Sequence, residues 1–396
     1  MNNIKKLIDI LRSKDIYPDI RSVQGVATEP EIIVDGKRVI LFCSNNYLGL
    51  SNNKEVKESI KNAVEKYGMG SGGSRLVSGN LDIHQELEHE IASFKGSESA
   101  VNFLSGYMAN TGTIPAVLTD LEYSLKSIFK NKLLVDRAEV FSDELNHASI
   151  VDGCRLSKAE IVVYKHKDTI DLEKKLKKSK ALKKLIISDG VFSMDGDIAP
   201  IDKLADLAEK YRSMLMIDDA HGSGVLGPNG EGTEAHFKLK NKVDITLGTY
   251  TKAFGGVGGF VSGTKALTDF LRITARSYIF SAPIPPSISA GLITAIKIAK
   301  NEGFRREKLI SNAKYLRLKL KDSGFNVLGE TPIIPVVIGK DEDSISMSRK
   351  LFEKGIFAPA IRWPAVPKNQ SRLRLTVMAT HTKEQIDTLV DSLNSL

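Results

Sequence analysis

The feature that most constrains the fold is a series of short apolar runs that alternate with helical patterns between about residues 54 and 280. The expected strands are Ala100–Phe103, Glu139–Phe141, Ile161–Tyr164, Leu185–Ile187, Leu215–Ile217, Ile245–Leu247 and Gly259–Val261. The expected helices lie near residues 83–95, 200–212 and 264–275. This alternation predicts an α/β fold, with a mostly parallel sheet that helices cover on both faces.

Two further patterns divide the chain. Residues 32–42 predict a hairpin, because Asp35-Gly36 forms a tight turn between two apolar runs. Pro283-Ile284-Pro285-Pro286 is the strongest break in the sequence, and mixed helical and strand patterns follow it. We therefore expect an N-terminal segment at residues 1–50, a large ligand-binding domain at 51–282 and a smaller α+β domain at 283–396.

The composition argues against several classes of protein. No apolar run approaches the roughly 20 residues that cross a bilayer, so we expect no membrane span. The two cysteines, Cys43 and Cys154, form no disulfide framework, which favours a cytoplasmic location, with Cys154 in the core. The net charge of +8 lies largely in lysine clusters that lack interleaved aromatic residues, so nucleic acid is not an expected partner. The clusters indicate either a solvated helix face or attraction for an anionic partner.

Two polar segments directly follow expected strands. Asp218, Asp219 and His221 follow the run 215–217, and Lys252 follows the run 245–247. Ligands bind at the carboxyl edge of parallel sheets, where we expect these side chains to meet. A buried carboxylate and a single lysine suit pyridoxal phosphate (PLP). The lysine amine forms a Schiff base with its aldehyde, and the carboxylate keeps its pyridine nitrogen protonated.

Three segments are candidates for holding a phosphate. Gly68–Arg75 is rich in glycine, which permits close backbone approach but is equally typical of a flexible surface loop. Ser105-Gly106-Tyr107 opens a helical pattern, so its amides can bind a phosphate while Ser105 caps the helix. Thr249 and Thr251 could add hydroxyl donors, or could reflect strand propensity alone.

Other readings of the same residues stay open. Asp218, Asp219, His147 and His221 could form a metal site, which would make the chain a metal-dependent hydrolase, although no HExxH spacing supports this. The chain could also bind a cofactor without turning over a substrate. Finally, Arg372 and Arg374 alternate with leucines and therefore share one strand face, where they could bind a substrate carboxylate or face solvent.

Taken together, these segments resemble the α-oxoamine synthases, PLP enzymes of the aspartate-aminotransferase fold (fold type I). The resemblance covers nearly the whole chain and rests on Ser44–Leu50, Gly70–Arg75, Ser105–Tyr107, Leu145–Ser149, Gly190–Asp197, Asp218–Gly222 and Thr249–Lys252. Members of this family condense an amino acid with an acyl thioester, lose carbon dioxide and release an α-amino ketone. The resemblance also implies a homodimer with its site at the subunit boundary.

The resemblance implies catalytic and cofactor-binding roles for individual residues. Lys252 would form the Schiff base with PLP and would move the substrate proton, while Asp218 would pair with the pyridine nitrogen. His147 would stack on the ring and polarise the thioester oxygen. Ser193 and His221 would bind the ring hydroxyl. The residues expected to hold the phosphate are Gly106, Tyr107 and Thr249.

Substrate contacts follow from the same resemblance. Asn45 and Arg374 would bind the amino-acid carboxylate, and Arg21 would contact the acyl chain. Pro359–Pro367 is most similar to the members that join L-alanine to a pimeloyl thioester, carried by coenzyme A or a carrier protein, in biotin synthesis. The sequence departs from the usual pattern of these members in two places. Trp363-Pro364-Ala365 stands where they have Pro-Pro-Thr, and the connection at 118–137 is longer than theirs. The serine-using palmitoyltransferases and the glycine-using 2-amino-3-ketobutyrate ligases are the alternatives within the family.

Overall fold

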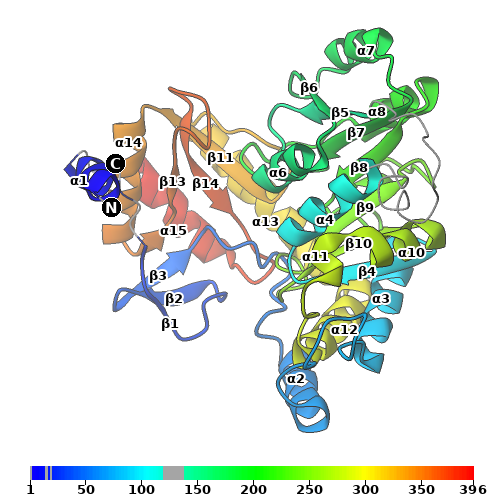
Figure 1. Cartoon of the computed structure of the whole chain (residues 1–396). Helices are drawn as coiled ribbons and strands as arrows, with labels where there is room; N and C mark the ends of the chain where they lie inside the picture. Colours follow the sequence, from blue (N-terminus) through cyan, green and yellow to red (C-terminus); the bar gives the residue numbers. More distant parts are fainter. Residues whose placement is uncertain (1, 14–16, 18–19, 119–137) are drawn as a thin grey trace, which may run out of the picture.

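The computed structural model describes residues 2–13, 17, 20–118 and 138–396, and a seven-stranded sheet forms its centre (Figure 1). The strand order is β4-β10-β9-β8-β7-β5-β6. The bounds are β4 Ser99–Phe103, β5 Ala138–Asp143, β6 Glu160–Tyr164, β7 Lys183–Asp189, β8 Met214–Asp218, β9 Ile245–Thr249 and β10 Gly259–Gly263. Only β10 runs antiparallel to its neighbours, so the prediction of a mostly parallel sheet is confirmed.

Side-chain alternation within the strands builds a core on each face of this sheet. In β7, Leu185 and Ile187 pack into one cluster, while Ile186 packs into the cluster on the opposite face. The first cluster includes residues of α4 (Gly106–Leu118), α6 (Ala148–Ser157), α10 (Lys265–Thr274) and α11 (Arg276–Ile279). The second includes residues of α7 (Thr169–Lys178) and α8 (Ile201–Lys210). The sheet is therefore covered on both faces, as predicted.

Two smaller sheets lie beside the central one (Figure 1). The first contains β1 (Val23–Gln24), β2 (Glu31–Val34), β3 (Lys37–Leu41) and β12 (Ile356–Phe357). Its predicted hairpin turn is confirmed, because Asp35 and Gly36 both have positive φ angles, of 50° and 79°. The second sheet contains β11 (Ile333–Gly339), β13 (Ala360–Ile361) and β14 (Ser371–Thr376).

The remaining helices are α1 (Asn2–Ser13), α2 (Lys54–Tyr67), α3 (Asp82–Lys95), α9 (Thr233–His236), α12 (Pro286–Asn301), α13 (Gly303–Asp322), α14 (Asp341–Glu353) and α15 (Lys383–Asn394). The helix α12 begins just after the proposed boundary at residue 283, yet it packs against the preceding region. Ser59 Oγ of α2 donates a hydrogen bond to the Ala290 carbonyl at 3.2 Å. Lys297 pairs with Glu86 and Glu90 of α3. The domain division stays a prediction.

Three expectations from the composition bear on this fold. None of the helices formed by the described residues is both long and apolar enough to cross a bilayer. Cys154 is buried in the core, as expected. On α7, Leu172 and Leu176 are buried while Lys174, Lys177 and Lys178 are exposed, which is the pattern of a solvated helix face.

Close approach between β10 and the start of α4 depends on a missing side chain. A Cβ atom added to Gly259 would lie 2.6 Å from the Gly106 nitrogen and 2.7 Å from its Cα atom, so backbone would have to move. We expect Gly259→Ala to lower the free energy of unfolding by about 1–3 kcal/mol, the usual range for overpacking. Urea unfolding measures this change.

The matched control is Gly303→Ala, where an added Cβ would meet only the end of the Arg306 side chain, at 3.5 Å. We expect this variant to unfold like the parent chain. Equal stability of the two variants would contradict the argument for a close contact at Gly259.

Candidate active site

The predicted site residues gather where the parallel strands end. Asp218 ends β8, Asp189 ends β7 and Thr249 ends β9, and these strands are neighbours in the sheet. His147 follows β5 and is the N-cap residue of α6. Figure 1 shows β7, β8 and β9 side by side, with α4 and α6 against them. Asp218 and Lys252, which were expected to meet at this edge, lie close enough for their charges to interact.

Asp218 is buried and held by two hydrogen bonds. Its Oδ2 atom accepts a bond of 2.7 Å from Asn110 Nδ2, and its Oδ1 atom accepts one of 3.1 Å from the Ala220 amide. Burial raises the pKa of Asp218, while the Asn110 bond and the nearby charges of Lys252 and His147 oppose that rise. The carboxylate is therefore fixed in place, and a nearby positive charge favours its ionised form.

Lys252 lies in the loop that follows β9, half-buried. Within the described residues its ammonium group makes no hydrogen bond or salt bridge. Burial lowers the pKa of Lys252, and Arg374 lowers it further, against the opposing charges of Asp218 and Asp189. An amine without a partner and with a lowered pKa is suited to covalent chemistry.

The start of α4 offers free backbone donors. Ser105 Oγ accepts from the Met108 amide at 3.1 Å, whereas the amides of Gly106 and Tyr107 have no partner in the described part of the chain. Thr249 Oγ1 donates to the Gly258 carbonyl at 2.8 Å and lies 2.8 Å from Thr251 Oγ1. The Tyr107 hydroxyl donates instead to Asp152. The backbone amides, rather than the Tyr107 hydroxyl, are therefore the donors available to an anion.

His147 is exposed and anchored from one side. Its backbone N–H donates to Asp189 Oδ2 at 2.7 Å, and its Nδ1 atom lies 2.7 Å from Ser149 Oγ. Burial of the ring nitrogens and the charge of Lys252 lower the pKa of His147, while Asp218 raises it. The lowered pKa favours the neutral imidazole, and the exposure of the residue leaves it accessible to a ligand.

A second hydrogen-bond network joins the segment after β3, the loops after β7 and β8, and strand β14. His221 Nδ1 lies 2.7 Å from the Tyr47 hydroxyl, which lies 3.3 Å from Asn45 Oδ1. The two terminal nitrogens of Arg374 lie 3.4 and 3.3 Å from the same oxygen, and Arg374 Nε donates to the Ser193 carbonyl. The structure therefore brings together Asn45, Ser193, His221 and Arg374, as predicted. Their roles toward ligands stay predictions.

Two other arginines lie apart from these groups. Arg21 NH1 donates to Asp35 Oδ2 at 3.1 Å, and its guanidinium lies 3.9 Å from the centre of the Phe352 ring. Its proposed contact with an acyl chain stays a prediction. Arg372 is buried and pairs with Asp195 at 2.7 Å. Arg372 and Arg374 share one face as predicted, and the alternative that this face is solvated is wrong.

Four residues that support the site were not predicted from the sequence: Asn110, Asn146, Ser149 and Asp189. Asn110 lies four residues after Gly106 on α4, so the helical repeat already placed both on one face. Asp189 ends an expected strand, as Asp218 does, and this similarity could have identified it as a site residue. Asn146 and Ser149 flank His147, and their roles depend on side-chain geometry that spacing does not give.

The neighbouring aspartate, Asp219, has a purely structural set of partners. It pairs with Lys95 at 2.7 Å and accepts hydrogen bonds from Ser223 at 2.9 Å and Thr233 at 2.8 Å. In the residues that the structure describes, no three His, Cys, Asp or Glu side chains are grouped to hold a metal ion. The hydrolase alternative therefore has no ligand set in this part of the chain.

Comparison with known proteins agrees with this geometry. The family model described as aminotransferase class I and II matches residues 37–393. A protein from Lysinibacillus sphaericus named 8-amino-7-oxononanoate synthase is 48% identical over 94% of this chain and 92% of its own length. Its namesake from Thermoanaerobacter pseudethanolicus is 46% identical over 97% of this chain and 94% of its own.

A solved structure supports the assignment of the fold. Serine palmitoyltransferase from S. paucimobilis, with a bound PLP–myriocin aldimine, superposes with a TM-score of 0.91 at 32% identity, covering 99% of this chain and 96% of that one. The chain belongs to the α-oxoamine synthases of the aminotransferase class I and II family. The predictions of family and of fold type I are confirmed.

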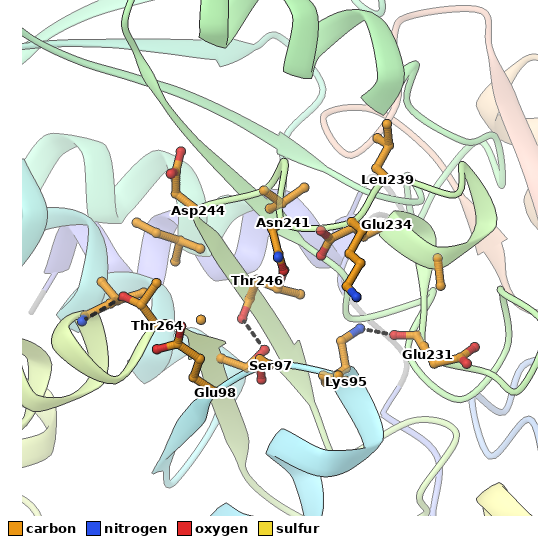
Figure 2. Close-up of a pocket in the computed structure, with 18 of the residues that line it drawn as sticks. Lys95, Ser97, Glu98, Glu231, Glu234, Leu239, Asn241, Asp244, Thr246 and Thr264 are labelled. Carbon is orange, nitrogen blue, oxygen red and sulfur yellow. Dashed lines mark hydrogen bonds between the residues drawn. The ribbon is translucent and has the colours of Figure 1, made fainter.

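A cavity in the described part of this α-oxoamine synthase lies away from these residues, at the opposite edge of the sheet (Figure 2). It has a volume of about 690 Å³, and residues at the starts of β8 and β9 line it. Figure 2 shows Lys95 bonded to Glu231 at its border, with Glu98, Glu234 and Asp244 around it. None of the predicted site residues lines this cavity.

A histidine clamp joins two loops of the α-oxoamine synthase site. His166 Nδ1 lies 3.1 Å from Asp143 at the end of β5, and His166 Nε2 lies 3.0 Å from Asp197 in the loop after β7. The Asp143 loop leads to His147, and the Asp197 loop carries Ser193. Burial lowers the pKa of His166, but the bonds to both aspartates outweigh it and raise the pKa to about 9.

This clamp predicts a pH-dependent contribution to stability. Since the pKa of His166 rises from 6.5 to about 9 on folding, the contribution is complete below pH 6.5 and is lost as the pH rises through 9. We expect His166→Gln to lower the free energy of unfolding by up to about 3 kcal/mol near pH 6 and by much less near pH 10. Urea unfolding at both values measures the difference.

His236→Gln is the control for that measurement. His236 is exposed, and its ring contacts the neighbouring Phe237 ring. We expect its effect to be small at both pH values. If the loss caused by His166→Gln were equal at the two pH values, the charged clamp would be wrong.

Proposed function

We propose that this chain is a PLP-dependent 8-amino-7-oxononanoate synthase, which condenses L-alanine with a pimeloyl thioester and releases carbon dioxide and the thiol. The observation that carries the proposal is the amine of Lys252, which has no partner among the described residues, beside the anchored carboxylate of Asp218. Identities of 48% and 46% to two proteins of that name support the choice of substrates.

The residues present fit PLP. Asp218 is available for the pyridine nitrogen, because its two hydrogen bonds leave lone pairs unused. The amides of Gly106 and Tyr107 have no partner in the part of the chain that the structure describes. With Thr249 and Thr251 beside them, they are suited to the phosphate. His147 would cover one face of the ring, and Ser193 and His221 would lie near the ring hydroxyl. These assignments are part of the proposal.

When bound, PLP withdraws electrons from the carbon atom next to the substrate amine and so makes its proton acidic. Lys252 supplies the base, because burial lowers the pKa of its amine and so favours the uncharged form that accepts a proton. Asp218 supplies the fixed negative charge that favours a protonated pyridine nitrogen. His147 supplies a neutral N–H donor that can polarise the thioester oxygen.

Arg374 and Asn45 suit the carboxylate of the amino acid. The contacts of the Arg374 terminal nitrogens with Asn45, at 3.3 and 3.4 Å, are long, so a carboxylate can replace them with shorter bidentate bonds. Arg374 also lowers the pKa of His221, after the larger effect of burial, which indicates that its charge reaches the site. We propose that this arginine orients L-alanine before its proton is removed.

We also propose a homodimer whose interface borders the site. Five apolar or aromatic side chains around the start of α4 are exposed: Leu76, Val77, Tyr107, Val257 and Phe280. Arg75 lies 5.5 Å from the Tyr278 ring, and Ser277 Oγ donates to the Met108 carbonyl at 2.6 Å, so these segments are close together. An apolar surface of this kind favours a protein partner. The cytoplasmic location stays a prediction.

A substrate panel tests the reaction. We expect carbon dioxide release with L-alanine and pimeloyl thioester, and little with serine or glycine or with palmitoyl or acetyl thioesters. Borohydride should reduce the Schiff base, remove the yellow colour of the protein and leave the pyridoxyl group attached to Lys252 as a stable amine. Lys252→Ala should lose about 100- to 10,000-fold in kcat, because it removes both the covalent attachment and the base. Mass spectrometry of the reduced peptide and a carbon dioxide assay measure these outcomes.

Three results would contradict the proposal. Turnover with serine and a long acyl chain alone would assign the chain to the palmitoyltransferase reaction. A yellow protein that no amino acid perturbs would indicate a binder without turnover. A colourless protein that chelators inactivate would indicate the hydrolase.

A further inference from the structure

A continuous chain of side-chain hydrogen bonds joins Asp218 to His147 through two residues that the proposed function does not use. Asn110 Nδ2 lies 2.7 Å from Asp218 Oδ2 and 2.9 Å from Ser149 Oγ. Ser149 Oγ in turn lies 2.7 Å from His147 Nδ1. The four residues belong to β8, α4 and α6 and the cap of α6, so the chain of bonds ties three elements together.

Donors and acceptors fix the direction of this chain. An ionised Asp218 only accepts, so the Asn110 amide must present its nitrogen, whose two hydrogens then serve Asp218 and Ser149. Ser149 Oγ accepts from Asn110 and has one hydrogen left for His147 Nδ1. The backbone N–H of Ser149 also donates to His147 Nδ1, at 3.2 Å. A ring nitrogen that accepts two bonds carries no hydrogen of its own.

The surroundings of both relay residues agree with this direction. Asn110 and Ser149 are almost fully buried, so water does not compete for their hydrogens. The Asn110 Oδ1 atom has no partner in the described residues, which shows that the side chain is oriented by its donors. The charged groups that act on the His147 ring are Asp218 and Lys252, while Asp189 binds its backbone.

We infer that Asn110 and Ser149 are positioning residues that hold His147 as the neutral tautomer with its hydrogen on Nε2 and couple it to Asp218. The inference deepens the proposed function, since it rests on the roles of Asp218 and His147 toward PLP. It gives His147 a single ring donor, at Nε2, for a substrate oxygen. It also means that a change in the protonation state of the Asp218 carboxylate affects the His147 imidazole.

The test reads the tautomer directly. The full-length chain, labelled with ¹⁵N-histidine and loaded with PLP, is studied by two-bond ¹⁵N–¹H correlation near pH 7.5, with His147→Gln to assign the signal. We expect a neutral ring with its hydrogen on Nε2. Ser149→Ala removes one of the two donors to Nδ1, so protonation there becomes less unfavourable and the pKa of His147 shifts upward.

Ser157→Ala is the matched control, because Ser157 is a buried serine on the same helix whose hydroxyl bonds only to nearby backbone. It donates to the Cys154 carbonyl at 2.6 Å and accepts from the Ala159 amide at 3.2 Å, among the described residues. We expect it to leave the His147 signal unchanged. Asn110→Leu should raise the dissociation constant for PLP at least about tenfold, since Asp218 loses its side-chain donor.

A hydrogen on Nδ1 of His147 in the parent protein would overturn the inference, and so would Ser149→Ala behaving like Ser157→Ala. The parent measurement stands even if a variant fails to fold. Failure of the proposed function would look different, because the predicted tautomer would be present in a protein that releases no carbon dioxide from alanine and pimeloyl thioester.

Discussion

The site depends on one buried carboxylate whose negative charge is held in place by neutral donors. Asp218 lies at the end of a central strand, bonded to Asn110 and to the Ala220 amide, with Lys252 close enough for their charges to interact. Burial alone would favour the protonated acid. The site therefore favours a cationic ligand next to Asp218. Burial in the same site lowers the pKa of Lys252, although the charge of Asp218 opposes that shift.

Other contacts in the structure hold the loops around that carboxylate in place. The adjacent Asp219 is bonded to Lys95 of α3, Ser223 and Thr233, so the loop after β8 is fastened independently of any ligand. His166 fastens the loops after β5 and β7 in a similar way. The two consecutive aspartates thus have different roles, because Asp219 is bonded to other protein groups whereas Asp218 is available to a ligand.

Much of this arrangement could be predicted from the sequence because it follows from periodicity. The seven strands, the hairpin at Asp35-Gly36 and the meeting of Asp218 with Lys252 all follow from apolar runs and from the geometry of parallel sheets. The roles of Asn110 and Ser149 could not be predicted, since they depend on which way a buried amide turns. Spacing also could not show that Asp219 pairs with Lys95, 124 residues earlier, or that Arg372 is buried against Asp195.

The protonation state of the cofactor nitrogen tests the central claim most directly. With ¹⁵N-labelled PLP bound to the full-length chain, we predict a protonated pyridine nitrogen in the parent protein and an unprotonated one in Asp218→Asn, with the fold unchanged. An unprotonated nitrogen in the parent, or the same signal in both proteins, would contradict the claim that the buried carboxylate of Asp218 sets the chemistry of this site.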